Sequence, residues 1–361
     1  MQKTVLPVSF FMGVNNQSGF CSLFGELYNP YEQGEHIILK GGPGTGKSTL
    51  MKKIAQKTER MGLYTERGFC SADPNSLDAV IVPEINFSII DGTAPHTFDP
   101  KMPGISEHIV DLGVAWDRKY LQSHIYEIGQ LMQENSLQHK RAADFLMVAS
   151  QIERESATIC VGLIDEIKLE RFAKRLANRE IPSRKGVKQG EAKKRFLSAV
   201  TPEGVVVQYD SVVALCEKII TVEDEFSAVS PFIAEYVSAY ARNNGYDVIE
   251  CFCPLFPRMK IEHLIIPELK LALFTQNSYH ASIDGGEKIV HASRFYDKEG
   301  IKSNREKLNL QRKAKKELID EAARKLSLAK DIHDRLEDYY IKATDFDVIN
   351  EIGEKVLGSV K

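Results

Sequence analysis

Several features typical of secreted, membrane-spanning and strongly basic proteins are missing from this 361-residue chain. Its six cysteines form no Cys-x-x-Cys pair and no framework like that of disulfide-rich secreted domains, which favours a reducing compartment. No apolar run approaches the roughly 20 residues that span a bilayer. A net charge of −3 gives no overall nucleic-acid footprint. We therefore expect a soluble, cytoplasmic protein without a membrane partner.

The most informative stretch that is present is a glycine-rich loop at residues 41–49. It fits the phosphate-binding pattern Gly-x-x-x-x-Gly-Lys-[Ser/Thr], because glycines let backbone N–H groups surround an anion. Lys47 is expected to reach the β- and γ-phosphates of ATP, and the Ser48 hydroxyl to bind Mg²⁺. The predicted nucleotide-binding residues are Gly41, Gly42, Pro43, Gly44, Thr45, Gly46, Lys47, Ser48 and Thr49.

The flanking sequence supports this interpretation of the loop. Residues 36–40 read as a buried strand that leads into it. Leu50, Met51, Ile54 and Ala55 then recur at helical spacing, and Gly62 stands where the helix would end. A strand, a glycine loop and a helix in this order are the context that a phosphate-binding loop requires.

A second candidate element of the site is Asp91, which ends the apolar strand candidate 86–90. We expect it to act as the Walker B aspartate that orients Mg²⁺ through water, so Lys47 and Asp91 are the predicted catalytic residues, and Ser48 and Asp91 the predicted metal ligands. Gly92 follows Asp91, where fast ATPases often carry a glutamate. The sequence context singles out no water-activating residue among Glu66, Asp78 and Glu84.

The chain also repeats itself. Gly62, Phe69, Cys70 and Pro74 recur 183 residues later as Gly245, Phe252, Cys253 and Pro257. Residues 77–84 match 261–268 at an offset of 184, which also aligns His96 with His280. The helical region around 142–152 matches 322–332 at an offset of 180. These matches predict two copies of one α/β unit.

The second copy has lost its loop. At offset 183 the glycine loop falls on residues 224–231, where Ser230 replaces Lys47 and Asp224 and Glu225 bring negative charge to the anion position. A like-charge contact at 4 Å costs roughly 4 kcal/mol at an effective dielectric of 20, enough to abolish useful phosphate binding. Ser230 is expected to cap the following helix. Thr275 replaces Asp91, so one nucleotide per chain is expected.

These features resemble a family of little-characterised bacterial proteins with two tandem P-loop units, usually labelled ATPase or nucleotide kinase. The resemblance spans nearly the whole chain and rests chiefly on residues 41–49, on Asp91-Gly92-Thr93-Ala94-Pro95-His96 and on residues 262–268. It implies ATP binding with Mg²⁺ and fixes no physiological substrate.

Three functions fit these predictions. The first is Mg²⁺-dependent ATP hydrolysis coupled to a conformational change. The second is a kinase acting on a nucleotide or small molecule, whose acceptor pocket could be lined by Asp73, Asp78 and His96. The third is a nucleotide-gated scaffold that binds a protein or nucleic acid without turnover.

The basic residues of 302–316 and of the linker 179–195 could contact nucleic acid. For 302–316, a solvated charged face of a helix is favoured. In the linker region, Arg184 or Arg195 could act as an arginine finger.

The predicted fold is therefore α/β, with two tandem P-loop NTPase-like units on mainly parallel sheets, each followed by a long helical hairpin. We place the nucleotide-binding unit at residues 1–185 and the degenerate repeat at 186–361. The acceptor, the protein partner and the oligomeric state do not follow from the sequence.

Overall fold

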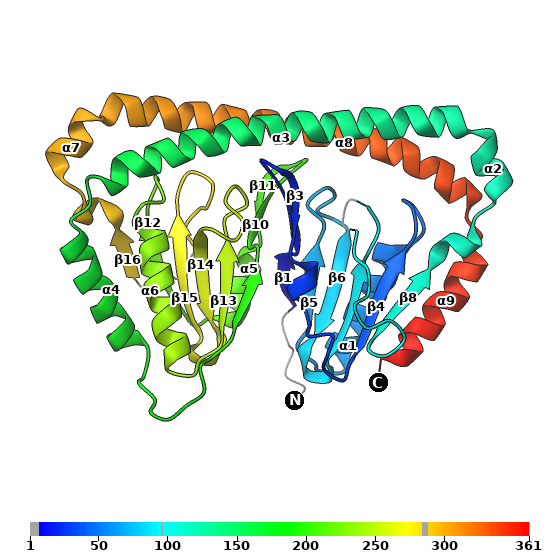
Figure 1. Cartoon of the computed structure of the whole chain (residues 1–361), viewed down its shortest axis with the longest axis horizontal. Coiled ribbons are helices and arrows are strands. Elements are labelled where there is room, and N and C mark those ends of the chain that lie inside the picture. Colours follow the sequence, from blue (N-terminus) through cyan, green and yellow to red (C-terminus); the bar gives the residue numbers. More distant parts are fainter. Residues whose placement is uncertain (1–6, 95–96, 284–287, 361) are drawn as a thin grey trace.

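A computed structural model describes residues 7–94, 97–283 and 288–360 of the chain. It contains two six-stranded sheets that lie side by side below a pair of long helices (Figure 1). The first sheet has the strand order β1 (Val8–Phe11), β5 (Glu66–Phe69), β6 (Leu77–Val82), β7 (Phe87–Asp91), β4 (Glu35–Lys40) and β8 (Glu107–Asp111). The second has the order β9 (Ala192–Arg195), β13 (Val248–Phe252), β14 (Ile261–Ile266), β15 (Leu271–Gln276), β12 (Lys218–Glu223) and β16 (Lys288–His291).

The two sheets have the same topology, which fits the predicted internal repeat. Each is mixed, because β6 and β14 run antiparallel to both of their neighbours while the other pairings are parallel. A short 3₁₀ turn reverses the chain after each of these strands, and it ends on Asn86 or Lys270 with φ of 45° or 48°. The sheets are thus mostly parallel, with one reversed strand that the sequence did not predict.

Further small elements join the sheets at the centre of the molecule. They are the hairpins β2 (Gly13–Asn16) with β3 (Gly19–Ser22) and β10 (Ser198–Thr201) with β11 (Gly204–Val207), the short helix α5 (Tyr209–Leu215), and the 3₁₀ turn η1 (Phe24–Glu26). Phe11 and Phe196 exchange backbone hydrogen bonds, 2.9 and 3.2 Å long, in both directions. Such a reciprocal pair is what two copies related by a local two-fold axis would make.

Each repeat carries a helix after its loop and three helices after its sheet. The loop helices are α1 (Lys47–Arg60) and α6 (Ser230–Asn243). The later ones are α2 (Arg118–Ser123), α3 (Ile125–Val161) and α4 (Glu166–Glu180) in the first repeat, and α7 (Lys298–Ser303), α8 (Arg305–Ala343) and α9 (Phe346–Ser359) in the second. Among the described residues, no helix combines the length and the apolar character needed to cross a membrane.

The long helices do not fold back as the two hairpins that the sequence suggested. Instead α3 crosses the molecule in one piece and packs along α8, which runs in the opposite direction (Figure 1). The hydrogen bond from Ser156 to Gln311 and the ion pair between Glu155 and Lys307 join the two helices. Leucine and alanine spacing identifies the apolar face of a helix but not the helix that covers it, which is why the sequence could not predict this pairing.

As a result, the terminal helix of each repeat lies on the sheet of the other. Helix α4 packs against α6, with Leu169 and Phe172 in the core of the second sheet. Helix α9 packs against α1, with Val356 in the core of the first. The packing therefore crosses the predicted division at residue 185 in both directions.

The core follows from the alternation of side chains along the strands. In the first sheet Ile37 and Ile89 face α1 and α9, whereas Ile38 and Ile90 face a central cluster. That central cluster also contains Ile265 and Phe274 of the second sheet. This central cluster, shared by both sheets, therefore packs the two repeats against each other.

Candidate nucleotide site and a second polar cluster

The glycine loop of the first repeat connects β4 to α1, as predicted. Gly44 and Gly46 have φ of 70° and 82°, a backbone conformation that residues with a Cβ rarely adopt. The Thr45 hydroxyl donates a hydrogen bond to the Gly42 carbonyl (2.9 Å), which tightens the turn. The loop therefore has the backbone shape and the helix N-terminus that bind an anion.

The predicted catalytic residues lie together at the ends of neighbouring strands. Because β4 and β7 are parallel neighbours, Asp91 ends beside the start of the loop. Lys47 Nζ lies 3.6 Å from Asp91 Oδ2 and donates hydrogen bonds to the Gly41 and Gly42 carbonyls, 2.9 and 2.6 Å away. The Ser48 hydroxyl oxygen accepts a hydrogen bond from the Leu77 N–H (3.0 Å). Pro43 and Thr49 make no polar contact of this kind among the described residues, and Thr49 is exposed.

The loop is also covered by a helix of the other repeat, which sequence reasoning missed. A Cβ placed on Gly44 would lie 2.7 Å from Ile341 Cγ1 and 2.9 Å from Glu337 Cγ, both on α8. A Cβ on Gly42 would lie 3.0 Å from the Tyr340 ring. The glycines are therefore needed for the close approach of α8 as well as for the turn. The helical spacing of residues 337, 340 and 341 indicates that they share one face of a helix. It does not indicate which part of the chain that face contacts.

In the degenerate loop of the second repeat, a carboxylate of the chain itself lies at the N-terminus of α6. Asp224, which stands where Gly41 stands, is buried, and its Oδ2 accepts hydrogen bonds from the Val229 and Ser230 N–H groups, each 2.8 Å away. Those N–H groups correspond to Gly46 and Lys47 of the intact loop. The predicted capping role of Ser230 was wrong, since Val229 is the N-cap residue and the Asp224 carboxylate satisfies the end of α6.

Several residues considered as water-activating groups or arginine fingers have structural contacts instead. Arg195 is buried in an ion pair with Glu66, with Nη2 and Oε2 2.7 Å apart, so neither is available at the loop. Arg184 pairs with Glu268 in the second repeat and lies over the Tyr246 ring. The Glu84 carboxylate accepts a hydrogen bond from the Tyr64 N–H. His96, the predicted acceptor-pocket histidine, lies outside the described residues.

Comparison with protein-family models, with curated proteins and with solved structures found no match for this chain. The family resemblance, the nucleotide and the reaction thus stay predictions from the residues themselves.

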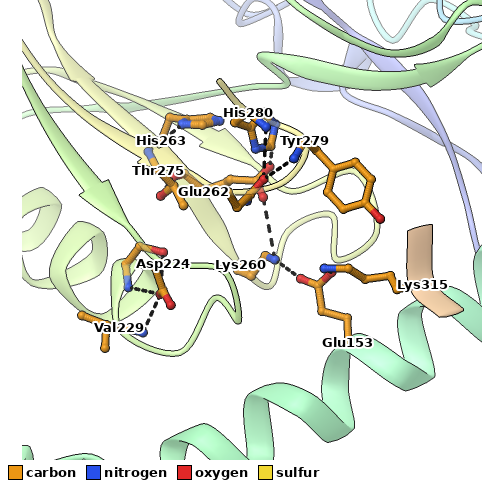
Figure 2. A network of polar contacts seen from close by, with 12 residues as sticks. Glu153, Asp224, Val229, Lys260, Glu262, His263, Thr275, Tyr279, His280 and Lys315 are labelled. Atoms are coloured by element: carbon orange, nitrogen blue, oxygen red, sulfur yellow. Dashed lines mark hydrogen bonds and ion pairs between the residues drawn. The ribbon is translucent and has the colours of Figure 1, made fainter. Parts of the chain in front are cut away.

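A second polar cluster lies in the other repeat, where Glu262, His263 and His280 are all buried (Figure 2). One potential metal-ligating atom of each lies within 4.8 Å of the others. Burial lowers the pKa of both imidazoles, so both rings are neutral near pH 7. Glu262 Oε2, His263 Nε2 and both ring nitrogens of His280 have no hydrogen-bond partner within the described residues. By position these three side chains could hold a metal ion.

The chemistry of the cluster favours water over a metal. His263 Nδ1 accepts a hydrogen bond from the Thr275 N–H (3.1 Å), so the neutral ring carries its proton on Nε2 and has no lone pair there for a metal. Lys260 Nζ also lies 3.8 Å from Glu262 Oε1 and already provides a cation. A buried water could accept from His263 Nε2–H and donate to Glu262 Oε2.

The charges beside this cluster tie the second sheet to the long helices. The Lys260 ammonium pairs with Glu153 of α3, and Lys315 Nζ of α8 lies 3.2 Å from the same carboxylate (Figure 2). Lys315 belongs to the basic stretch 302–316, but its side chain is buried and does not face solvent. Its charge thus contributes to packing within the chain.

Proposed function

We propose that the first repeat binds Mg²⁺-ATP at residues 41–49 and hydrolyses it. The observation that carries the proposal is the convergence of Lys47 and Asp91, 3.6 Å apart, beside a loop with positive φ at Gly44 and Gly46. The carboxylate held by the corresponding N–H groups of the second repeat supports it, because it occupies the place of an anion. Bound Mg²⁺, held by Ser48 and through water by Asp91, would neutralise charge on the phosphates.

We further propose that nucleotide binding changes the position of the last turns of α8, residues 337–343. The last turns of this helix lie on the loop, and a helix C-terminus carries about half a negative charge. The Glu337 carboxylate adds to it on the same face. A triphosphate entering the loop meets this negative charge at short range, so binding works against the docked position of these last turns, while the turn that carries Lys330 stays in place. Hydrolysis and release would restore it, which couples turnover to the helix pair.

The proposal is tested by phosphate release from Mg²⁺-ATP and by ATP binding. Lys47→Ala and Asp91→Asn should each lower turnover by about 100-fold or more, since each removes charge stabilisation at the phosphates. Lys52→Ala, on the exposed side of the same helix, serves as the matched control and should behave like wild type.

Unchanged turnover in Lys47→Ala would overturn the site assignment. A wild-type protein that binds ATP but releases no phosphate would overturn hydrolysis. The kinase and the nucleotide-gated scaffold would then remain, and phosphate transfer to an added acceptor would distinguish them.

A further inference from the structure

One face of α8 points from the second repeat toward the loop of the first. Lys330, His333, Glu337 and Tyr340 are spaced by three or four residues and therefore share this face. Lys330 Nζ pairs with Asp334 one turn further on (3.0 Å) and also lies 4.0 Å from Asp73 Oδ1 of the first repeat. The Lys330 ammonium thus bridges the two repeats.

A short series of contacts connects this ammonium with the phosphate site. Asp73 Oδ2 accepts a hydrogen bond from the Ser76 hydroxyl (2.6 Å). The next residue, Leu77, donates its N–H to the Ser48 hydroxyl oxygen. Lys330 therefore lies at the turn that adjoins Ser48, at the end of the loop where the terminal phosphate is expected.

His333 places the same face near Lys47. Burial is the main cause that lowers the pKa of His333, and the positive charges of Lys330 and Lys47 lower it further, against the carboxylates of Glu337 and Asp334. These groups are thus close enough to influence one another electrostatically. The face carries Lys330 at one end and Glu337, beside Gly44, at the other.

The second repeat provides an internal comparison. On α3 the positions that correspond to Lys330, His333 and Tyr340 are Ser150, Glu153 and Cys160, which are all buried. Ser150 donates a hydrogen bond to the Met147 carbonyl, and Glu153 pairs with Lys260 and Lys315 (Figure 2). Beside the degenerate loop, this face of α3 is thus filled with contacts within the chain. On α8, by contrast, the Lys330 side chain is 31% exposed.

From these contacts we infer that Lys330 touches the terminal phosphate of ATP bound to the first repeat and is a catalytic residue contributed by the second. The inference rests on the proposed function. In hydrolysis the water oxygen forms a bond to the γ-phosphorus, and the bond to the β–γ bridging oxygen breaks. The electron pair of that bond stays on ADP, and the water proton passes to the released phosphate. The Lys330 ammonium stabilises the negative charge on the transferred phosphoryl oxygens.

The test compares Lys330→Met and Lys330→Arg with Lys316→Met in the full-length chain. Lys316 is the matched control, because it lies on the same helix and pairs in the same way with Asp320, four residues on. Exposed pairs of this kind contribute little to stability, so all variants should fold. We expect Lys330→Met to lower kcat by about tenfold or more, with Lys330→Arg retaining much of the activity.

The relative binding affinities for ATP and ADP test the role of Lys330 even if turnover is slow. Lys330→Met should reduce the preference for ATP over ADP in binding by about tenfold, because only ATP has the phosphate that Lys330 would contact. Unchanged kcat and an unchanged ATP-to-ADP affinity ratio would overturn the role of Lys330 while leaving the nucleotide site intact. Loss of ATP binding in the wild-type protein would instead overturn the proposed function.

Discussion

At the scale of single residues, Glu153 is a buried carboxylate that lies between two ammonium groups, Lys260 and Lys315. Burial alone would raise the pKa of its carboxyl, but the charges of Lys260 and Lys315 outweigh burial and lower it to about 2. Because this pKa lies below the ordinary value of 4.5, the ionised carboxylate stabilises the folded protein above that value. We expect the melting temperature to fall as the pH is lowered from about 5 toward 2, measured by thermal unfolding.

The same residue allows a matched substitution. Glu153→Gln leaves the buried Lys315 ammonium without its carboxylate and, within the described residues, leaves Lys260 with only Glu262, 3.8 Å away. Breaking a buried pair in this way costs about 3–5 kcal/mol. Glu155 lies on α3 as Glu153 does, and it forms an exposed ion pair with Lys307 of α8. Glu155→Gln breaks this pair and should lower the free energy of unfolding by less than about 1 kcal/mol. The melting temperature of the Glu153→Gln variant should also fall less than that of the wild type when the pH is lowered from about 5 toward 2. Equal stability of the two variants in urea unfolding at pH 7 would contradict the structural role of Glu153.

Among single residues, the sequence predicted the features of the site that depend on short-range spacing. The loop and the strand that ends on Asp91 were recognisable, because their spacing is short-range. The negative charge of Asp224 was expected to oppose an anion, but its function as the internal ligand of Val229 and Ser230 was not. That function depends on the curl of the loop, which composition does not specify.

At the scale of elements, the last turns of α8 are the part expected to respond to nucleotide. We predict that Mg²⁺-ATP changes amide hydrogen exchange in residues 337–343, which lie on the loop, because the phosphates act against that contact. The first turns of α8, residues 305–312, lie far from the loop along a helix of 39 residues and should exchange as before. The Lys47→Ala variant should show no change in either segment. Equal exchange with and without nucleotide in a protein that binds ATP would contradict the coupling.

Some of the strands could be predicted from local sequence patterns and others could not. Strands β4 and β7 were predicted because they are apolar and rich in β-branched residues. Strands β1 and β9 and the small hairpins β2–β3 and β10–β11 were missed, since each has only four residues. The direction of β6 and the partner of α3 are long-range properties, and no local pattern encodes them.

At the scale of the whole molecule, the exchange of terminal helices makes the repeats interdependent. The Lys57 side chain of α1 donates hydrogen bonds to the Leu357 and Val360 carbonyls, about 300 residues away in the sequence. The buried Arg195–Glu66 pair and the reciprocal Phe11–Phe196 contact join the sheets directly. Neither sheet could therefore keep its full core if the other were removed.

This interdependence leads to a prediction about the linker between α4 and β9. Residues 182–189 are exposed, so a protease site placed there should be cut without unfolding the protein. Because α4 lies on the second sheet and α9 on the first, the two fragments should stay together and elute at the size of the intact chain. They should separate only under denaturing conditions, and the uncut variant is the control. Fragments that elute separately in native buffer would show that the two sequence copies are independent domains and that the exchanged helices do not hold them together.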